Sequence, residues 1–402
     1  MLSISANGKS QGVDTKASLF FKAARRCNLW NDTEPIHRSA FTKARKKVSW
    51  RIFQDILSHA VQVAYELWPQ KPEYLWHGMS VYAVDGSAYT LPATSALREE
   101  FDPESGLTHS GKGHYPQCLV STVYDVFRRL PISRTIVKAN GSERDEAKTL
   151  IPSIPSGGVI LFDRGYPGYE FIKELINIYR GYFLFRCPAS FTFPAVQALM
   201  ASRKKESVIW IDPTLTYRTH VGTKKWRQAK PIKLRCIKLM APDGTCSVLL
   251  TNLFDSRIFT RQDIISLYFR RWEVETHYRN EKIVLEVEKF HGKTPHSIRQ
   301  ELFAVMIMSV ISRTLMALSA LEFQEGKGAP QFKNAVMTLA YDAAALTPDE
   351  PEKAIKIFKE IIKEIARVKY YAPPKKRSSQ PRLTKGNINK WCVARQRKMA
   401  KA

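Results

Sequence analysis

The chain has 402 residues, 44% of them hydrophobic and 25% charged, so it is long enough for two or three domains and typical of a soluble globular protein. Its 63 Lys and Arg outnumber 37 Asp and Glu, and the resulting net charge of +26 favours a polyanionic partner, above all nucleic acid. Six cysteines without a C-x2-C pair argue against a zinc site or a secreted disulfide framework, and the first twelve residues lack the apolar core of a signal peptide, so a reducing cytoplasm is expected.

Residues 1–76 are predicted to be helical and basic. The segment Phe41–Arg51 places five cations among apolar positions, and helical periodicity continues from Trp50 to Trp68. The region is interpreted as a DNA-binding module whose cations meet phosphates. The alternative is a solvated helix face that packs on the main body.

Residues 77–190 alternate between strands and helices and are predicted to form the first part of a catalytic core. The order is three strands, a helix, a strand, a helix and a strand, with the first helix opening near Ser142. This order matches an RNase H-like α/β fold, a mixed sheet flanked by helices. The expected strands are 81–85, 118–127, 131–137, 158–163 and 181–186, and the second helix is 169–179.

Residues 191–255 are predicted to be an all-β insertion with basic character. Its expected strands are 207–212, 215–221, 232–239 and 245–251, the last two joined by a hairpin turn. Residues 256–321 are predicted to be helical again and to form the second part of the core. The longest apolar run, 302–311, has about half the length that a bilayer-spanning helix needs, so it is expected to be a buried core helix. Residues 322–402 are expected to hold further helices and a tail with eleven Lys or Arg after position 368.

One segment of the second core part carries a distinctive spacing. Tyr268, Arg271, Glu275 and Lys282 stand at relative positions 0, 3, 7 and 14. On one continuous α-helix these side chains would fall within an arc of about 60°, because each residue turns about 100°. A carboxylate flanked by a phenol and two cations suits a face that holds a metal ion and a phosphodiester.

Two further carboxylates stand at predicted strand ends. Asp85 follows the first strand, where the alternative is an Asp-Gly turn, and Asp163 follows the fourth, where the alternative is a helix cap. A single Glu such as Glu275 is most often a solvated charge. In an RNase H-like fold, however, the first and fourth strands are neighbours, and a later helix brings the third carboxylate across them.

The motifs around Asp85, Asp163 and the Y-x2-R-x3-E-x6-K segment resemble those of IS4-family DDE transposases, in the same order over residues 80–300. The resemblance implies a triad of Asp85, Asp163 and Glu275 that binds Mg²⁺, with Mn²⁺ able to substitute. It also implies that Tyr268, Arg271 and Lys282 contact phosphates at a transposon end. Arg supplies a planar fork for phosphate oxygens, Lys a point charge and Tyr a donor.

Weaker candidates accompany this set. Trp226 is a candidate to stack on a flipped base, as an aromatic residue of the insertion does in some relatives. The alternative is that Trp226 packs on its own domain. Arg164 is expected either to contact phosphate or to pair with a local acidic residue. The expected function is a cut-and-paste DNA transposase, with an RNase H-like nuclease or a non-catalytic DNA-binding protein as alternatives. Double-stranded DNA is the expected partner, with no membrane, and holding two ends together implies a homodimer, with residues 321–370 as the suggested contact.

Overall fold

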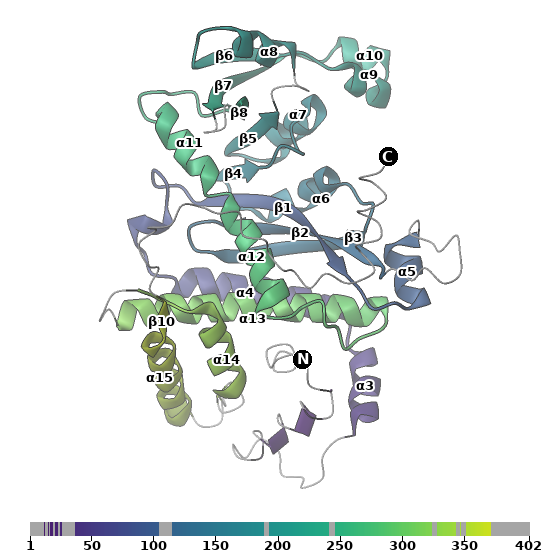
Figure 1. Ribbon diagram of the computed structural model, residues 1–402, viewed down its shortest axis with the longest axis vertical. Coiled ribbons are helices and arrows are strands. Elements are labelled where there is room, and N and C mark those ends of the chain that lie inside the picture. Colours follow the sequence, from purple (N-terminus) through teal and green to yellow (C-terminus); the bar gives the residue numbers. More distant parts are fainter. Residues whose placement is uncertain are drawn as a thin grey trace, which may run out of the picture.

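The computed structural model describes residues 37–103, 115–188, 193–240, 246–323, 328–342, 346 and 351–370, together with isolated positions between 12 and 25. Within these residues one eight-stranded sheet has the order β3-β2-β1-β4-β5-β8-β7-β6. It runs along the long axis of the molecule, with the insertion at one end and a layer of long helices at the other (Figure 1). The expected basic tail from 371 to 402 and most of residues 1–36 lie outside the described residues.

The first five strands form the RNase H-like half of the sheet. They are β1 (Val81–Thr90), β2 (Gln117–Asp125), β3 (Leu130–Lys138), β4 (Val159–Phe162) and β5 (Tyr182–Pro188). β1 pairs antiparallel with β2 and parallel with β4, and β4 is parallel to β5. The expectation that the first and fourth strands are neighbours is therefore confirmed. β4 is buried along its whole length, as an apolar strand covered on both faces should be.

Helices cover both faces of this half. α5 (Ser95–Phe101) follows β1, α6 (Glu143–Leu150) follows β3, and α7 (Tyr169–Ile178) joins β4 to β5. α6 opens where the sequence predicts it, because the Ser142 side chain accepts a hydrogen bond from Asp145 N. The strand β1 continues through Asp85 and Gly86 to Thr90, so the alternative of an Asp-Gly turn at this point is wrong.

The insertion is not all-β. It contains β6 (Glu206–Ile211), β7 (Ile232–Met240) and β8 (Cys246–Thr251), but also α8 (Pro194–Ala201), α9 (Leu215–Val221) and α10 (Thr223–Arg227). The segment expected as a strand at 215–221 is helical because Thr214 caps its first turn and Gly222, at φ +81°, ends it. β8 pairs antiparallel with β5, so the insertion continues the catalytic sheet.

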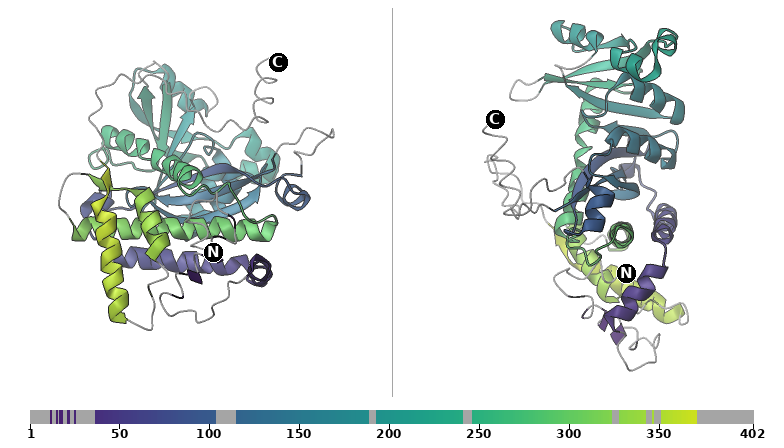
Figure 2. Two further views of the ribbon diagram at one scale, coloured as in Figure 1. Left: turned by 60° about the horizontal axis from the view of Figure 1, so that its bottom comes forward. Right: turned by 90° about the vertical axis from the view of Figure 1, so that its right-hand side faces the viewer.

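Two long helices lie side by side beneath the sheet (Figures 1 and 2). α4 (Trp50–Leu67) packs on α13 (Pro295–Glu322), and the rings of Trp50 and Phe303 stack at 5.8 Å. α13 is long and apolar enough to cross a membrane, but 78% of its most apolar window is buried inside the fold. The prediction of a buried core helix is confirmed. The short helix α3 (Arg38–Lys47) precedes α4, and a 3₁₀ turn (Pro72–Tyr74) follows α4.

The remaining elements close the structure. α11 (Arg261–Phe269) and α12 (Trp272–Ile283) run from the insertion across β1 (Figure 1). After α13 come β9 (Ala329–Pro330), α14 (Phe332–Asp342), α15 (Pro351–Arg367) and β10 (Lys369–Tyr370), and α14 and α15 both pack on α13. Residues Ile361, Ile362 and Ile365 supply the buried face of α15.

Candidate active site

Asp85 and Asp163 occupy neighbouring positions on adjacent strands. The last pair in the parallel register of β1 and β4 is Val84 with Phe162, so the two aspartates follow as the next residue on each strand. Beyond this point β4 ends while β1 continues, paired only with β2. The edge of β1 from Asp85 onward is therefore open on the β4 side. Two carboxylates meet at this opening.

The four-residue signature does not lie on one regular helix, contrary to expectation. α11 ends at Phe269 and α12 begins at Trp272, and between them Arg271 N bonds to Tyr268 O in a tight three-residue step. Tyr268 therefore belongs to α11, whereas Glu275 and Lys282 belong to α12. The break leaves Arg271 at the junction of the two helices.

Arg271 connects the carboxylates of two elements. Its Nη2 donates to Glu275 Oε1 at 2.6 Å, and its Nη1 lies 3.6 Å from Asp85 Oδ2. The side chain is only 7% exposed, and Nη1 has no hydrogen-bond partner in the described part of the chain. Burial by itself would lower the pKa of Arg271, but Tyr268, Asp85 and Asp163 raise it. The guanidinium thus stays charged in a largely enclosed acidic setting.

The acidic character of the site also perturbs Asp85. Burial raises the pKa of Asp85 to about 7, against the attraction of Arg271, and the negative charges of Glu143, Asp163 and Glu275 act in the same direction as burial. A largely buried carboxyl group with such a pKa, beside a specific charge partner, is a candidate functional group.

α12 is fixed to β1 by two side chains. The Tyr278 hydroxyl donates to Asp85 O at 2.7 Å, beside Val120 O at 3.2 Å. Lys282 Nζ donates to Ser87 Oγ at 2.9 Å and to Ala88 O at 2.7 Å. In this structure Lys282 binds the strand that carries Asp85, and its side chain is 30% exposed. The helix and the strand are therefore held in register at the carboxylates.

A buried polar cluster behind the site was not found from the sequence. Arg134 and Glu281 form an ion pair at 2.7 Å with both side chains fully buried. The Tyr89 hydroxyl donates to Glu281 at 2.5 Å, and His277 Nε2 lies 3.3 Å from the same carboxylate. No linear spacing signals this cluster, since its members come from β1, β3 and α12. It anchors the middle of α12 to the sheet.

The other predicted site residues are distributed around this centre. Tyr268 is 5% exposed, and its hydroxyl has no hydrogen-bond partner among the described residues. Trp226 packs against the core of the insertion, its Nε1 donates to Pro213 O at 3.0 Å, and Arg218 lies 5.5 Å from its ring. These contacts tie Trp226 to its own domain. Sequence reasoning also passed over Phe269 and Trp272, which are 62% and 56% exposed on either side of Arg271.

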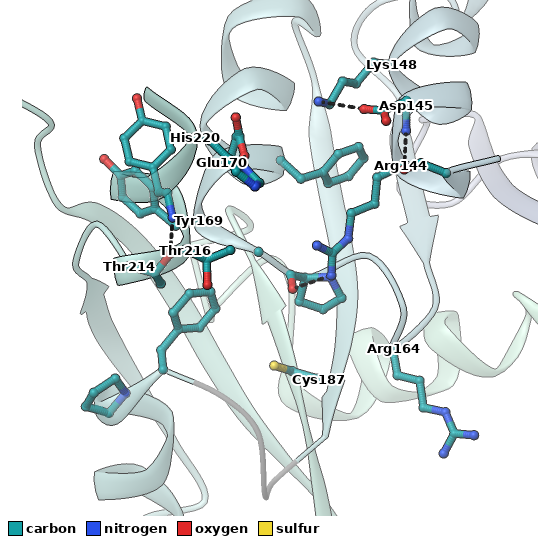
Figure 3. A pocket seen from close by; sticks show the side chains of 17 residues that line it. Arg144, Asp145, Lys148, Arg164, Tyr169, Glu170, Cys187, Thr214, Thr216 and His220 are labelled. Carbon is teal, nitrogen blue, oxygen red and sulfur yellow. Dashed lines mark hydrogen bonds and ion pairs between the residues drawn. The ribbon is translucent and has the colours of Figure 1, made fainter. Parts of the chain in front are cut away.

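Arg164 is exposed and lines a pocket of about 590 Å³ between α6, α7 and α9 (Figure 3). On the same side of this pocket Arg144 donates to Gly165 O at 3.0 Å and to Pro167 O at 3.2 Å (Figure 3). These bonds hold the loop that follows Asp163. His220 is paired with Glu170 at 2.7 Å across the same pocket. The pocket is thus closely tied to the position of Asp163.

The donor chemistry of the site fits a hard divalent cation. Mg²⁺ prefers carboxylate oxygens and keeps several waters, so it needs few protein ligands. In the described ranges no group of three or more Asp, Glu, His or Cys side chains lies close enough together to hold a metal ion. Arg271 explains the separation, because its guanidinium lies between Asp85 and Glu275. Asp163, in contrast, forms no ion pair with any residue that the structure describes.

The sequence is similar to those of known transposases. The family model of the transposase DDE domain matches residues 76–311. The chain is 27% identical over 198 residues to the putative transposase y4zB of Sinorhizobium fredii, covering 49% of this chain and 53% of the relative. It is 22% identical over 276 residues to the transposase InsG of insertion sequence element IS4 of Escherichia coli, covering 67% and 59%. The chain therefore spans little more than half the length of these relatives.

A solved structure of the piggyBac transposase synaptic complex with hairpin DNA is similar over 77% of this chain and 61% of that chain, with 11% sequence identity and a TM-score of 0.43. That similarity is too weak to inform the site. The match over residues 76–311, in contrast, covers all three predicted carboxylates and more than half of the chain. The resemblance to IS4-family transposases is thereby confirmed, and the chain belongs to the family of proteins with a transposase DDE domain.

Proposed function

We propose that the protein is the DNA transposase of an insertion sequence, which cleaves DNA at the ends of its element and joins the freed 3′-OH to target DNA. The observation that carries this proposal is the placement of Asp85 and Asp163 side by side at the end of β4, with the helix of Glu275 docked across them. Family membership supports the same reaction class. The net charge of +26 supports a nucleic-acid substrate.

The carboxylates of Asp85, Asp163 and Glu275 are proposed to hold divalent cations, Mg²⁺ or Mn²⁺. When bound, such cations activate the attacking hydroxyl or water and stabilise the leaving oxygen. Glu275 then has to exchange its bond with Arg271 for this role. A phosphate of the bound DNA is a suitable replacement partner for Arg271, since its fork matches phosphate oxygens as well as carboxylate oxygens.

The remaining site residues are proposed to position DNA. Tyr268 and Arg271 border the carboxylates and are assigned to the scissile phosphate, whereas Lys282 is assigned first to fixing α12 on β1 and then to the backbone of the DNA end. Arg164 is assigned to a phosphate near Asp163. A stacking role for Trp226 requires it to leave Pro213, so we place it last among the candidates.

Two DNA ends have to be held together, so the active complex is proposed to be a homodimer. The region suggested by the sequence, residues 321–370, presents exposed apolar side chains of Leu321, Tyr341 and Ile355. The proposal of a homodimer rests on the need to hold two ends, because apolar side chains scattered singly over a surface are ordinary.

A cleavage assay tests the proposal. The full chain is incubated with a duplex that carries the terminal inverted repeat of its element, with Mg²⁺, and with the variants Asp85→Asn, Asp163→Asn and Glu275→Gln. Each variant is expected to lose cleavage by at least about a hundredfold. Glu273→Gln is the matched control, because Glu273 lies on the same helix and pairs with Arg129 instead. Cleavage that survives all three substitutions contradicts the assignment.

The same assay separates the alternatives. Pre-cut ends with a free 3′-OH and a supercoiled target plasmid report strand transfer. A nuclease without strand transfer cuts the repeats but joins no pre-cut end, and a non-catalytic protein shifts the duplex in a gel without cutting it.

A further inference from the structure

A fully buried carboxylate lies on the same helix as Glu275. Glu281 of α12 is 0% exposed, and Arg134 of β3 donates from Nη2 to its Oε1 at 2.7 Å. The Tyr89 hydroxyl of β1 donates to the other oxygen, Oε2, at 2.5 Å. Arg134 also donates from Nη1 to Leu302 O of α13 at 3.0 Å. This one carboxylate therefore joins α12 to two strands and, through Arg134, to the long core helix.

The sheet fixes where the partners of Glu281 stand relative to Asp85. Asp85 is opposite Thr122 in the register of β1 and β2, and Thr122 is opposite Arg134 in the register of β2 and β3. These three side chains therefore share one row and one face of the sheet, the face that α12 crosses (Figure 1). Tyr89, four residues after Asp85 on the same strand, points to that face as well. Glu281 is thus bound by groups that backbone hydrogen bonds hold in place around Asp85.

The two glutamates of α12 point in different directions. They are six residues apart, which on an α-helix corresponds to about 120° of rotation and about 9 Å along the axis. Glu281 is turned into the sheet, whereas the side chain of Glu275 is 31% exposed beside Asp85 and Arg271. A contact fixed at Glu281 thus opposes any rotation or sliding of α12 that would carry Glu275 away from Asp85.

Stability alone does not explain a buried ion pair at this place. Removing two charges from water is costly, and an apolar pair of similar volume is often equally stable or more so. Burial by itself would raise the pKa of Glu281, but the positive charge of Arg134 lowers it below its ordinary value. The pair therefore stays ionised. Because hydrogen bonds need defined directions and apolar contacts do not, the network selects one orientation of the helix.

We propose that Glu281 is a positioning residue of the active site, which holds α12 at the rotation and height that place Glu275 beside Asp85. This inference rests on the proposed function, since it treats Glu275 as one of the reacting carboxylates. Glu281, Arg134 and Tyr89 are at most 2% exposed, so the network acts through the position of α12 and not by touching DNA. A displacement of about 1 Å can slow an enzyme by about a hundredfold.

Tyr89→Phe tests the proposal, because it removes one hydrogen bond of the network and keeps the ring. The single-turnover rate of cleavage, measured with saturating protein below the onset of unfolding, should fall at least about fivefold, while Kd for the terminal-repeat duplex changes less than about twofold. A contribution to stability alone would leave the rate of the folded protein unchanged.

Tyr65→Phe is the matched control and should cleave at the native rate. Its hydroxyl donates at 3.0 Å to Asp125, which is also fully buried and is paired with Arg128 at 2.9 Å. This second network of a tyrosine, a carboxylate and an arginine joins α4 to the end of β2 and does not include α12.

Backbone hydrogen exchange in the DNA-free full chain measures the hold on α12 without any reaction. Exchange in residues 272–283 should be at least about threefold faster in Tyr89→Phe than in the native protein and unchanged in Tyr65→Phe. Equal protection of residues 272–283 in the native protein and in Tyr89→Phe overturns the proposal, and so does a native rate of cleavage in Tyr89→Phe.

An apolar replacement of the whole network separates position from stability. Tyr89→Phe, Arg134→Met and Glu281→Leu together should unfold at a urea concentration close to that of the native protein, yet cleave no faster than Tyr89→Phe alone. Cleavage at the native rate in this variant overturns the proposal. Should it fail to fold, the two measurements on Tyr89→Phe decide.

The outcomes distinguish this proposal from the proposed function. A native protein that cuts no terminal repeat contradicts the transposase reaction, but faster exchange of residues 272–283 in Tyr89→Phe still supports the hold of the network on α12. Unchanged exchange and cleavage in Tyr89→Phe reject the positioning role of Glu281 and leave the three carboxylates to be judged by their own variants.

Discussion

The ionised form of Asp85, which metal binding requires, is expected to destabilise the folded protein. Its pKa is raised to about 7 in the folded protein, from an ordinary value of 3.8. Between pH 3.8 and about pH 7 the Asp85 carboxyl therefore keeps its proton in the folded state but has lost it in the unfolded state. The contribution of Asp85 to the unfolding free energy is thus present at low pH and is lost as the pH rises towards 7. Asp85→Asn cannot ionise, so it should be free of this loss.

The magnitude follows from the shift. Between pH 5 and pH 8 the native protein should lose up to about 2.7 kcal/mol of unfolding free energy relative to Asp85→Asn, since each pKa unit corresponds to about 1.36 kcal/mol. The Asp85 side chain is 15% exposed, so solvent screening reduces this value only in part. Saturating Mg²⁺ should shrink the difference at pH 8, because a cation bound to the ionised carboxylate stabilises the native protein alone.

Urea denaturation followed by tryptophan fluorescence, at pH 5, 6, 7 and 8 with EDTA, measures the difference. Glu273→Gln serves as the control for the loss of a carboxylate on the neighbouring helix, where Glu273 pairs with Arg129. A difference between Asp85→Asn and the native protein that changes by less than about 0.5 kcal/mol over this range would refute the reasoning. An increase in the stability of the native protein relative to the variant would do so as well.

Three further outcomes are expected. Glu281→Gln leaves Arg134 as an unpaired buried charge and should lower the unfolding free energy by about 3–5 kcal/mol in thermal or urea denaturation, whereas a loss below about 1 kcal/mol contradicts the role of the buried cluster. Arg271→Lys keeps the charge but loses the fork between Asp85 and Glu275, so the rate of cleavage should fall at least about tenfold. The control is Arg270→Lys, which should cleave at the native rate, because the guanidinium of Arg270 lies 5.7 Å from the Phe127 ring instead. Equal rates for both variants exclude a special role for Arg271. Affinity for a terminal-repeat duplex should fall with salt at a log–log slope steeper than about −4, as filter binding between 50 and 300 mM KCl will show, and a slope near zero contradicts a phosphate-based interface.

The central geometry was predictable because it depends on strand order. Two predicted strands, one expected to end at Asp85 and one at Asp163, with two further strands and a helix between them, indicate that the two aspartates meet, and the parallel register of β1 and β4 agrees. The helix break at Arg271 was not predictable from propensity, because Arg270 and Arg271 are both good helix formers. The structure shows the three-residue step there as the hydrogen bond from Arg271 N to Tyr268 O.

The errors and omissions have physical causes. The segment 215–221 places Leu215, Tyr217, Thr219 and Val221 at alternate positions like a strand, yet the cap at Thr214 and the left-handed Gly222 make it helical. The Arg134–Glu281 pair joins residues 147 positions apart, so it leaves no trace in local spacing. Contacts of this kind exist only once the sheet has formed.

The pairing of β8 with β5 has a mechanical consequence. The ladder from Leu184–Thr251 to Pro188–Ser247 makes the insertion and the catalytic strands one continuous sheet. A sheet joined by a ladder of backbone hydrogen bonds has no hinge at that seam, so the insertion cannot swing as an independent arm over the carboxylates. If cleavage and joining require different alignments of substrate, the bound duplex has to bend or slide against a rigid platform.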